Sequence, residues 1–425
     1  MPDRFGISVV VSALLLVMGT SHATAAMVAV SAEPGALARS VQEAQPGDVL
    51  RLLPGAHIGP IVIDKSLTLD GAGKAHVIGS EKGSVITVTA TDVTLKGLHV
   101  SGSGSSGEHR DAGILLTKKA HNARVLNNKL TGNLVGVDVR GARDALVVGN
   151  IIEGRRGHRM NSRGNGVYVW NAPGAKVNGN DIRWGRDGIF VNTSRDNEFR
   201  SNRLRDLRFA IHYMYAHDST VADNISIGNH LGYALMFSKN VKVLRNLSSG
   251  DRDYGLMLNY TNSSEITGNR VERIKDRCVF IYNAHKNNFS NNRFESCGIG
   301  VHFTAGSERN QFTSNAFIGN RIQVKYVGSR WLDWGEKGVG NFWSDHAAYD
   351  LNRDGIADAL YRPNDRMDKV LWTQPDARSL LGSPAVQLIR WVLAKFPALT
   401  PGGLVDSHPL MQPVDPVLKA WKVLK

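Results

Sequence analysis

The fold of this chain is set out in residues 209–236, which read FAIHYMYAHDSTVADNISIGNHLGYALM. After the small residue Ala210, apolar side chains alternate with others, beginning with Ile211 and Tyr213. A second small residue, Gly232, follows 22 positions after Ala210, and the same alternation starts again. An alternation with a period of two predicts short strands that bury one face.

The same unit recurs on both sides of this stretch, marked by an asparagine in front of an apolar residue. These asparagines are Asn128, Asn150, Asn180, Asn202, Asn224, Asn246, Asn269, Asn292 and Asn315. They are 22 or 23 residues apart, except for one interval of 30. A fixed period of this length, with two or three short strands in each unit, indicates stacked coils. Helical repeats would need a period of 3.6, which is absent.

We therefore expect an all-β protein, a right-handed parallel β-helix (a solenoid) with coils of ~22–23 residues stacked ~4.8 Å apart. The asparagines are expected to form a ladder of side-chain amides, which makes them structural rather than functional residues. A short helix at residues 37–45 should cap the first coil. The long interval holds an inserted basic loop at residues 155–165.

The N-terminus predicts export from the cytoplasm. Arg4 precedes an apolar run at residues 7–18 and a stretch of small residues at 21–26, the pattern of a signal peptide. Cleavage is expected near Ala25, and a retained N-terminal anchor is the alternative. The resulting organisation is a signal peptide (1–25), a β-helix with its N-terminal cap (26–345), an Asp-rich closing segment (346–382) and a helix with an extended tail that docks on a membrane partner (383–425).

Composition narrows the possible partners. The chain has 425 residues, 51 Lys and Arg against 38 Asp and Glu, a formal charge of +13 and only two cysteines. With 42% hydrophobic residues it can bury a core, so wholesale disorder is excluded. Because an exported protein rarely meets DNA, the positive charge points to anionic lipid, a polyanionic substrate or another protein rather than nucleic acid.

One outward column of the predicted coils carries soft metal ligands. In each coil the second and fourth residues after the small residue should point outward. By this rule His212, Met214, Met236 and Met257 lie on three consecutive coils. With ~5 Å between coils and ~7 Å along a diagonal, their side chains can converge. Thioether and imidazole together favour Cu(I), so we predict a copper site here.

The alternative for this stripe is a hydrophobic docking patch, and the two interpretations are compatible. Further docking residues predicted on the stripe are Phe190, Phe280, Tyr282 and His302. Only one carboxylate, Asp138, occurs among the outward pairs of eight coils, whereas polysaccharide-modifying enzymes need several. We therefore expect no enzyme, and keep an exported polysaccharide-modifying enzyme or carbohydrate-binding β-helix as the alternative.

Two local features leave their alternatives open. Cys278 and Cys297 lie in successive coils at different offsets, so a disulfide and a pair of buried thiols both remain possible. The sequence DLNRDGIAD begins like a calcium-binding loop and offers Asp350, Asn352, Asp354 and Asp358 as ligands. The acid expected at its twelfth position is replaced by Tyr361, so an Asx-rich turn is the alternative to Ca²⁺.

Residues 384–396, PAVQLIRWVLAKF, predict an amphipathic helix. Its apolar face includes Leu388, Ile389, Val392, Leu393 and Phe396. Thirteen residues are too few to span a membrane, but they can lie in its interface or dock on a membrane partner. Packing against the solenoid end is the alternative. In the tail beyond, His408 and Met411 are also predicted to dock on a partner.

The coils, the block GNFWSDHAAYDLNRDGIADALY (340–361), the apolar helix and VDSHPLM (405–411) together resemble the NosD family. The resemblance covers essentially the whole mature chain, and the Asp-rich block with the tail is its specific part. NosD-like proteins are periplasmic parts of an ABC transporter that serves the maturation of nitrous-oxide reductase, which carries a copper–sulfur cluster.

The resemblance implies a set of partners and a location. The partners are a NosF-like ATPase, a NosY-like permease, a NosL-like copper chaperone and the reductase itself. The implied location is the periplasm, at the inner-membrane surface through the partner subunits. The resemblance carries over no ligand set, so the His and Met residues rest on the coil arithmetic alone. The leading hypothesis is a non-enzymatic maturation factor that receives or passes copper or a sulfur species.

Overall fold

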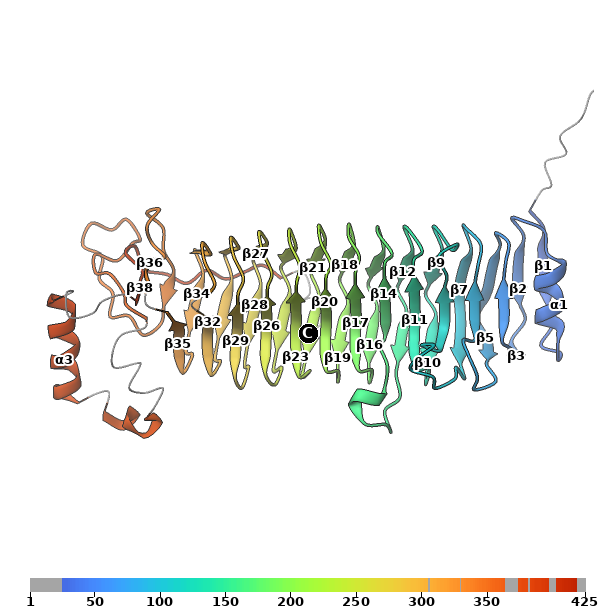
Figure 1. The fold of residues 1–425 in the computed structure, drawn as a ribbon, viewed down its shortest axis with the longest axis horizontal. Helices are drawn as coiled ribbons and strands as arrows, with labels where there is room; N and C mark the ends of the chain where they lie inside the picture. Colours follow the sequence, from blue (N-terminus) through green and yellow to red (C-terminus); the bar gives the residue numbers. More distant parts are fainter. Residues whose placement is uncertain are drawn as a thin grey trace, which may run out of the picture.

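The computed structural model describes residues 25–304, 306–328, 330–363, 374–380, 383–396 and 403–418. Figure 1 shows one elongated stack of coils, with α1 (Ala36–Glu43) at one end and α3 (Pro384–Lys395) at the other. The strands pair in parallel from coil to coil, which confirms the predicted all-β parallel solenoid. The signal-peptide prediction falls on residues 1–24, outside the described residues, and stays a prediction.

Each regular coil contributes one strand to each of three faces. The first face is a sheet of 12 strands. Its strands are β4 (Ile61–Ile63), β6 (Ile86–Val88), β8 (Ala112–Leu116), β11 (Val135–Arg140), β14 (Val167–Trp170), β17 (Asp187–Asn192), β20 (Phe209–Met214), β23 (Leu231–Met236), β26 (Tyr254–Asn259), β29 (Arg277–Tyr282), β32 (Ile299–Thr304) and β35 (Ile322–Val327).

The second and third faces are made of short strands of two or three residues. The second face has β9 (Arg124–Leu126), β12 (Leu146–Val148), β15 (Lys176–Asn178), β18 (Glu198–Arg200), β21 (Thr220–Ala222), β24 (Lys242–Leu244), β27 (Glu265–Thr267), β30 (Asn288–Ser290) and β33 (Gln311–Thr313). The third face has β10 (Lys129–Thr131), β13 (Ile151–Glu153), β16 (Asp181–Arg183), β19 (Arg203–Arg205), β22 (Ile225–Ile227), β25 (Leu247–Ser249), β28 (Arg270–Glu272), β31 (Arg293–Glu295), β34 (Ala316–Ile318) and β37 (Phe342–Trp343).

The N-terminal coils are capped as expected. They contain β1 (Met27–Val30), β2 (Val49–Leu52), β3 (Gly55–Ile58), β5 (Thr68–Ile78) and β7 (Thr94–Ser101). Helix α1 buries Leu37 and Val41 against this end, so the first coil does not present an open edge.

The asparagine ladder is present, and it ends in a way the sequence did not reveal. Asn128 Nδ2 donates to Asn150 Oδ1 at 3.1 Å, and the same bond repeats through each predicted asparagine to Asn315. Asn315 donates to Asn341 at 2.8 Å. Asp406, from the tail, then accepts from Asn341 Nδ2 (3.1 Å) and Trp343 Nε1 (2.9 Å). The tail therefore terminates the ladder.

The small residue of each coil faces the interior at a tight corner. A Cβ added at Gly136, Gly188 or Gly232 would lie 2.4–2.6 Å from a carbonyl oxygen of the next coil. The in–out alternation is interrupted there without any shift of register, because a Cβ added at Gly188 would also meet the core side chains of Leu204 (2.6 Å) and Leu207 (2.9 Å). Both Gly188 and Ile189 consequently face the core, while Asp187 points outward.

The C-terminal end of the core is closed by aromatic stacking and by the tail. Trp334 stacks on Phe312 with ring centroids 4.0 Å apart, and Trp343 stacks on Phe317 at 4.3 Å. Strand β36 (Trp331–Asp333) pairs in parallel with β38 (Gly403–Val405), which brings the tail back onto the solenoid. Residues 375–380 form a separate 3-10 turn, η2.

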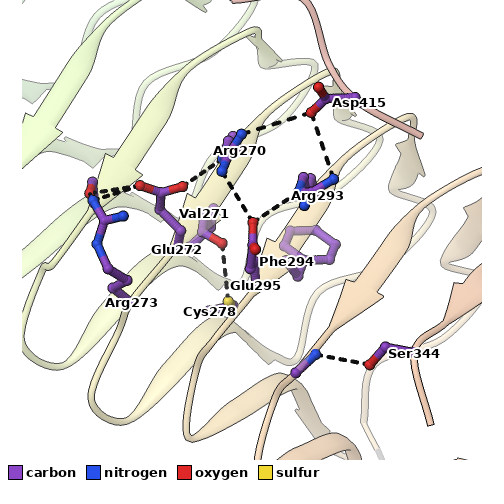
Figure 2. A network of polar contacts seen from close by, with 12 residues as sticks. Arg270, Val271, Glu272, Arg273, Cys278, Arg293, Phe294, Glu295, Ser344 and Asp415 are labelled. Atoms are coloured by element: carbon purple, nitrogen blue, oxygen red, sulfur yellow. Dashed lines mark hydrogen bonds and ion pairs between the residues drawn. The ribbon is translucent and has the colours of Figure 1, made fainter. Parts of the chain in front are cut away.

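The rest of the tail runs back along the third face (Figure 1). Figure 2 shows Asp415 beside Arg270 of β28 (3.8 Å) and Arg293 of β31 (3.7 Å), within a network that also includes Glu272 and Glu295. Further on, Leu418 is buried against Ile225 and Leu247 of β22 and β25. The extended tail that the sequence predicted is thus bound to the solenoid at several points.

Two sequence questions are answered by the fold. Cys278 and Cys297 form a disulfide with Cα atoms 5.7 Å apart. Ile299 pairs with Arg277, and this register brings Cys297 to the corner beside Cys278 despite their different offsets. The inserted loop contains a 3-10 turn, η1 (Met160–Ser162), and is anchored by Arg155, which donates to Gly104 O at 2.8 Å.

Candidate metal-binding site

The predicted soft ligands lie on adjacent strands of the 12-stranded sheet. In the register of β20 and β23, Met214 pairs with Met236 and His212 pairs with Ala234. In the next step, Ala234 pairs with Met257 of β26. His212 and Met257 therefore stand on either side of Ala234 in one column, and Met214 and Met236 are neighbours in the next. The predicted alignment is confirmed.

Two of the four side chains are in direct contact. His212 Nε2 lies 3.3 Å from Met236 Sδ. The other ring nitrogen, Nδ1, lies 3.3 Å from Asp187 Oδ2 on β17. Asp187 in turn accepts two hydrogen bonds from Arg208, from Nε at 2.8 Å and from Nη2 at 2.7 Å. The result is a continuous chain of contacts from an arginine through a carboxylate and an imidazole to a thioether.

This cluster is drier than an outward-facing stripe suggests. His212 is only 7% exposed and Ala234 only 1% exposed, although both point away from the core. Phe190 stacks on the His212 ring at 4.7 Å, and Phe209 meets it edge-on at 4.7 Å. Phe190, predicted as a docking residue, is thus a wall of the candidate site. Aromatic walls exclude water and hold the imidazole in one orientation.

Charge around the imidazole is balanced. Burial raises the pKa of Asp187, but hydrogen bonds from His212 and Arg208 outweigh it, so the pKa lies below its ordinary value. Asp187 is therefore an anion, paired with the guanidinium of Arg208. Arg186 stands 3.8 Å away from the same carboxylate.

Asp187 and Arg208 were missed by the sequence analysis. The sequence rule assigned outward positions only to the second and fourth residues after the small residue, and Asp187 comes before it. The alternation is interrupted at Gly188, so the residue before the small position also points outward. A third outward column results, which includes Asp187, Phe209, Leu231, Tyr254 and Arg277. A small residue that recurs where alternation begins was the available signal for this interruption.

The donor set suits a soft, singly charged ion. An imidazole nitrogen and a thioether sulfur that bound one ion at ~2.0 Å and ~2.3 Å, with 3.3 Å between them, would subtend about 100° at it. That angle fits three- or four-coordinate geometry. Soft neutral donors favour Cu(I) over hard cations. Within the described segments, no three His, Cys, Asp or Glu side chains gather in a metal-binding arrangement, so a site on this face depends on its thioethers.

The other docking residues predicted on the stripe form a second aromatic group on β29 and β32, where Phe280 is the strand neighbour of Met257. Phe280 lies 6.4 Å from Tyr282 and 5.2 Å from His302, ring to ring. Tyr282 is exposed, whereas burial, with Arg277 and Lys325 nearby, lowers the pKa of His302 to about 4. His302 is therefore neutral at physiological pH. Asp138, the one carboxylate of the predicted stripe, is buried beneath Arg140 and Arg110, and burial raises its pKa.

The predicted calcium ligands form a turn of their own. Their oxygens accept backbone N–H groups of the same loop, as an Asx-rich turn requires. The bonds run from Arg353 N to Asp350 Oδ1 (2.6 Å), Gly355 N to Asp350 Oδ2 (2.9 Å), Asp354 N to Asn352 Oδ1 (3.0 Å), Ile356 N to Asp354 Oδ1 (2.8 Å) and Leu351 N to Asp358 Oδ2 (2.7 Å). These hydrogen bonds explain the run of Asp and Asn residues without a bound ion, and the calcium site stays a prediction.

The helix and the tail differ in what they offer a partner. On α3, Leu388 and Ile389 are exposed, as is Phe396 just beyond its end, and Val392 is half-buried. The side chain of Leu393 lies outside the described residues. In the tail, His408 Nδ1 lies 2.7 Å from Gly335 O, and the Met411 backbone N–H donates to Gly355 O. His408 and Met411 are thus used in closing the solenoid, while α3 keeps an exposed apolar face.

None of the described helices has the length and apolar character needed to cross a membrane. Two curated relatives match most of the chain. A probable ABC transporter binding protein NosD from Stutzerimonas stutzeri is 37% identical over 376 residues, 85% of this chain and 86% of that protein. The protein of the same name from Pseudomonas aeruginosa is 39% identical over 374 residues, 85% of this chain and 87% of that protein.

A solved structure and a family profile complete the comparison. The A-module of the mannuronan C-5 epimerase AlgE6 from Azotobacter vinelandii aligns with a TM-score of 0.52 at 13% identity, over 68% of this chain and 89% of that one. At that identity the likeness shows the fold alone. The profile of the family described as "Periplasmic copper-binding protein (NosD)" matches residues 148–348, which include every strand of the His and Met cluster. Together with the two relatives, this match shows that the chain belongs to the NosD family.

Proposed function

We propose that this protein is a non-enzymatic periplasmic component of an ABC transporter that receives Cu(I), or a sulfur species that travels with it, for assembly of the copper–sulfur cluster of nitrous-oxide reductase. Copper is here the cargo. His212 and Met236 bind it, and Met214 and Met257 complete the donor set on the neighbouring positions of the sheet.

The observation that carries the proposal is the 3.3 Å approach of His212 Nε2 to Met236 Sδ on a face where two further methionines are in register. Methionine commonly fills gaps in a core, and on an outward face it is typical of binding surfaces, so thioethers in register beside an imidazole favour a binding role for this face. The description of the family as copper-binding supports the same chemistry.

The partners follow from the family. Curated relatives are named as probable ABC transporter binding proteins, which supports a NosF-like ATPase and a NosY-like permease as partners here. A NosL-like chaperone would supply copper and the reductase would accept it. Helix α3 presents the surface for the membrane-embedded subunit, because Leu388, Trp391 and Phe396 are each more than half exposed.

Titration with Cu(I) tests the proposal. The triple variant Met214→Leu, Met236→Leu and Met257→Leu keeps the side-chain volume and removes the sulfur atoms. We expect its affinity for Cu(I), measured by competition with a chromophoric chelator, to fall at least 100-fold, because about 1.4 kcal/mol accompanies each factor of ten and three thioether bonds are lost.

The matched control is Met160→Leu, in the inserted loop away from the cluster, which should bind Cu(I) like the unmodified protein. Equal affinity of the triple variant and the control would refute the copper site and leave only the docking interpretation of this face.

The Asp187–His212 pair favours one alternative, an exported enzyme that modifies a polysaccharide, since a carboxylate and an imidazole in contact can move protons. Gene neighbourhood separates the two functions. Neighbouring genes for an ATPase, a permease and nitrous-oxide reductase favour the transporter role, and genes for alginate or pectin metabolism favour the enzyme.

A further inference from the structure

We infer that Asp187 is the positioning residue of the copper site: it accepts the Nδ1–H of His212 and thereby turns the lone pair of Nε2 toward Met236 Sδ. This inference rests on the copper role proposed above. It assigns a function to a residue that is not itself a ligand.

The carboxylate is fixed before any ion arrives. Arg208 donates to both oxygens, at 2.8 Å and 2.7 Å, and Asp187 is fully buried. Both oxygens are therefore engaged, so the carboxylate cannot swing round to bind a metal ion. A bidentate arginine also fixes the plane of the carboxylate, and with it the direction from which His212 is held.

The contacts of the imidazole select one neutral tautomer. Nδ1 faces the Asp187 carboxylate at 3.3 Å, and Nε2 faces the Met236 sulfur at 3.3 Å. With the proton on Nδ1, the ring donates to an anion and Nε2 is free to bind a metal. With the proton on Nε2, a ring lone pair would face a buried anion, which is unfavourable where little water screens it.

The ring is also held against rotation. Phe190 covers one side of it at 4.7 Å, and the edge contact with Phe209 is 4.7 Å as well. A 180° flip about the Cβ–Cγ bond would put Cδ2 in the place of Nδ1 and Cε1 in the place of Nε2, and so break the contacts with both Asp187 and Met236. A carboxylate that orients a metal-binding histidine in this manner typically changes metal affinity or activity 10–100-fold.

The opposite charges of Asp187 and Arg208 cancel beside the site, leaving neutral ligands for the ion. A neutral set of one imidazole and thioethers suits Cu(I), whereas a divalent ion would gain little from it. Asp187 thus favours Cu(I) because its charge is neutralised by Arg208, and not because it binds the ion itself.

Nitrogen NMR of the metal-free protein tests the inference without copper. With ¹⁵N-labelled histidine, the chemical shifts of the two ring nitrogens identify the tautomer of His212. The His212 signals are assigned as those that disappear in His212→Gln. We expect the Nδ1–H tautomer in the unmodified protein. In Asp187→Asn that tautomer should lose its dominance, and the affinity for Cu(I) should fall about 10–100-fold.

Two further variants make the result specific. Asp223→Asn removes a carboxylate held by Arg245 in the same two-bonded manner, at 2.8 Å and 2.8 Å, and should change neither readout. Met236→Leu keeps the side-chain volume and leaves the Asp187 contact in place, so we expect the variant to fold and the tautomer to persist. If His212 carries its proton on Nε2, or if Met236→Leu shifts the tautomer, the inference is wrong.

The outcomes also separate this inference from the proposed function. If Cu(I) affinity responds to the methionine substitutions but not to Asp187→Asn, Asp187 does not position the ligand and the proposed function stands. If affinity responds to neither, the copper role fails and the inference fails with it.

Discussion

Asp251 shows how a single buried residue can make the stability of the solenoid depend on pH. It lies inside the solenoid and accepts from Ser226 Oγ (2.7 Å), from Ser248 Oγ and from Asn229 N (2.7 Å). Burial raises its pKa from 3.8 to about 6, against the hydrogen bonds, which lower it. Since the folded state holds the proton more tightly than the unfolded chain, the contribution of Asp251 to stability falls as the pH rises from about 4 to about 6.

Asp251→Asn removes this titration and keeps the shape of the side chain. We expect the free energy of unfolding of the variant, relative to the unmodified protein, to rise by about 2.4 kcal/mol between pH 4 and pH 7, because one pKa unit corresponds to about 1.4 kcal/mol and the unfolded side chain is already partly ionised at pH 4. Urea denaturation at several pH values measures this difference. Asp253→Asn is the control: the bond from Arg252 lowers the pKa of Asp253, so this carboxyl is largely ionised in both states above pH 4 and the variant's difference should stay nearly constant over the range. If the difference in unfolding free energy between Asp251→Asn and the unmodified protein does not change with pH, the account of Asp251 is contradicted.

Single residues also mark the limit of prediction from the sequence. His212, Met214, Met236 and Met257 were found because alternation along a strand fixes the direction of each side chain. Asp187 was not found, because the alternation is interrupted at the small residue and the residue before it points outward as well. Stacking by Phe190 and Phe209, which buries His212, depends on rotamers that a residue count does not contain.

Among the elements, α3 combines a defined helix start with an exposed apolar surface. Ser383 Oγ accepts the backbone N–H of Val386 and Pro384 occupies the first turn, so the helix is locally encoded. Leu388 is 61% exposed and Trp391 is 58% exposed, which is costly in water unless a partner covers them. The amphipathic helix was predicted from its 3.6-residue period, but its partner is set by another molecule.

The double variant Leu388→Ser and Trp391→Ser tests the docking role of α3. We expect it to leave the solenoid folded and to reduce co-purification with the membrane transporter at least tenfold, because two large exposed side chains of the apolar face are removed. Ala385→Ser, on an exposed residue of the same helix, is the matched control. Retention of the double variant on transporter-containing membranes would show that another surface makes the contact.

At the scale of the whole molecule, repetition made the fold predictable and the closing segments were harder. The nine asparagines and the 22–23-residue period specify stacked coils, because each coil buries the next. The return of the tail depends on contacts between residues far apart in sequence, such as Asp406 with Asn341 and Asp415 with Arg270. No local sequence pattern predicts such pairs, so the sequence indicated an extended tail without showing where it binds.

The central claim is that one face of this solenoid binds Cu(I) through an imidazole and thioethers. X-ray absorption at the copper edge of the protein with one equivalent of Cu(I) tests it most directly. We predict one nitrogen at about 2.0 Å and two or three sulfurs at about 2.3 Å, with the sulfur shell lost in the Met214, Met236 and Met257 triple variant. A first shell of nitrogen and oxygen only, unchanged in that variant, would contradict the account.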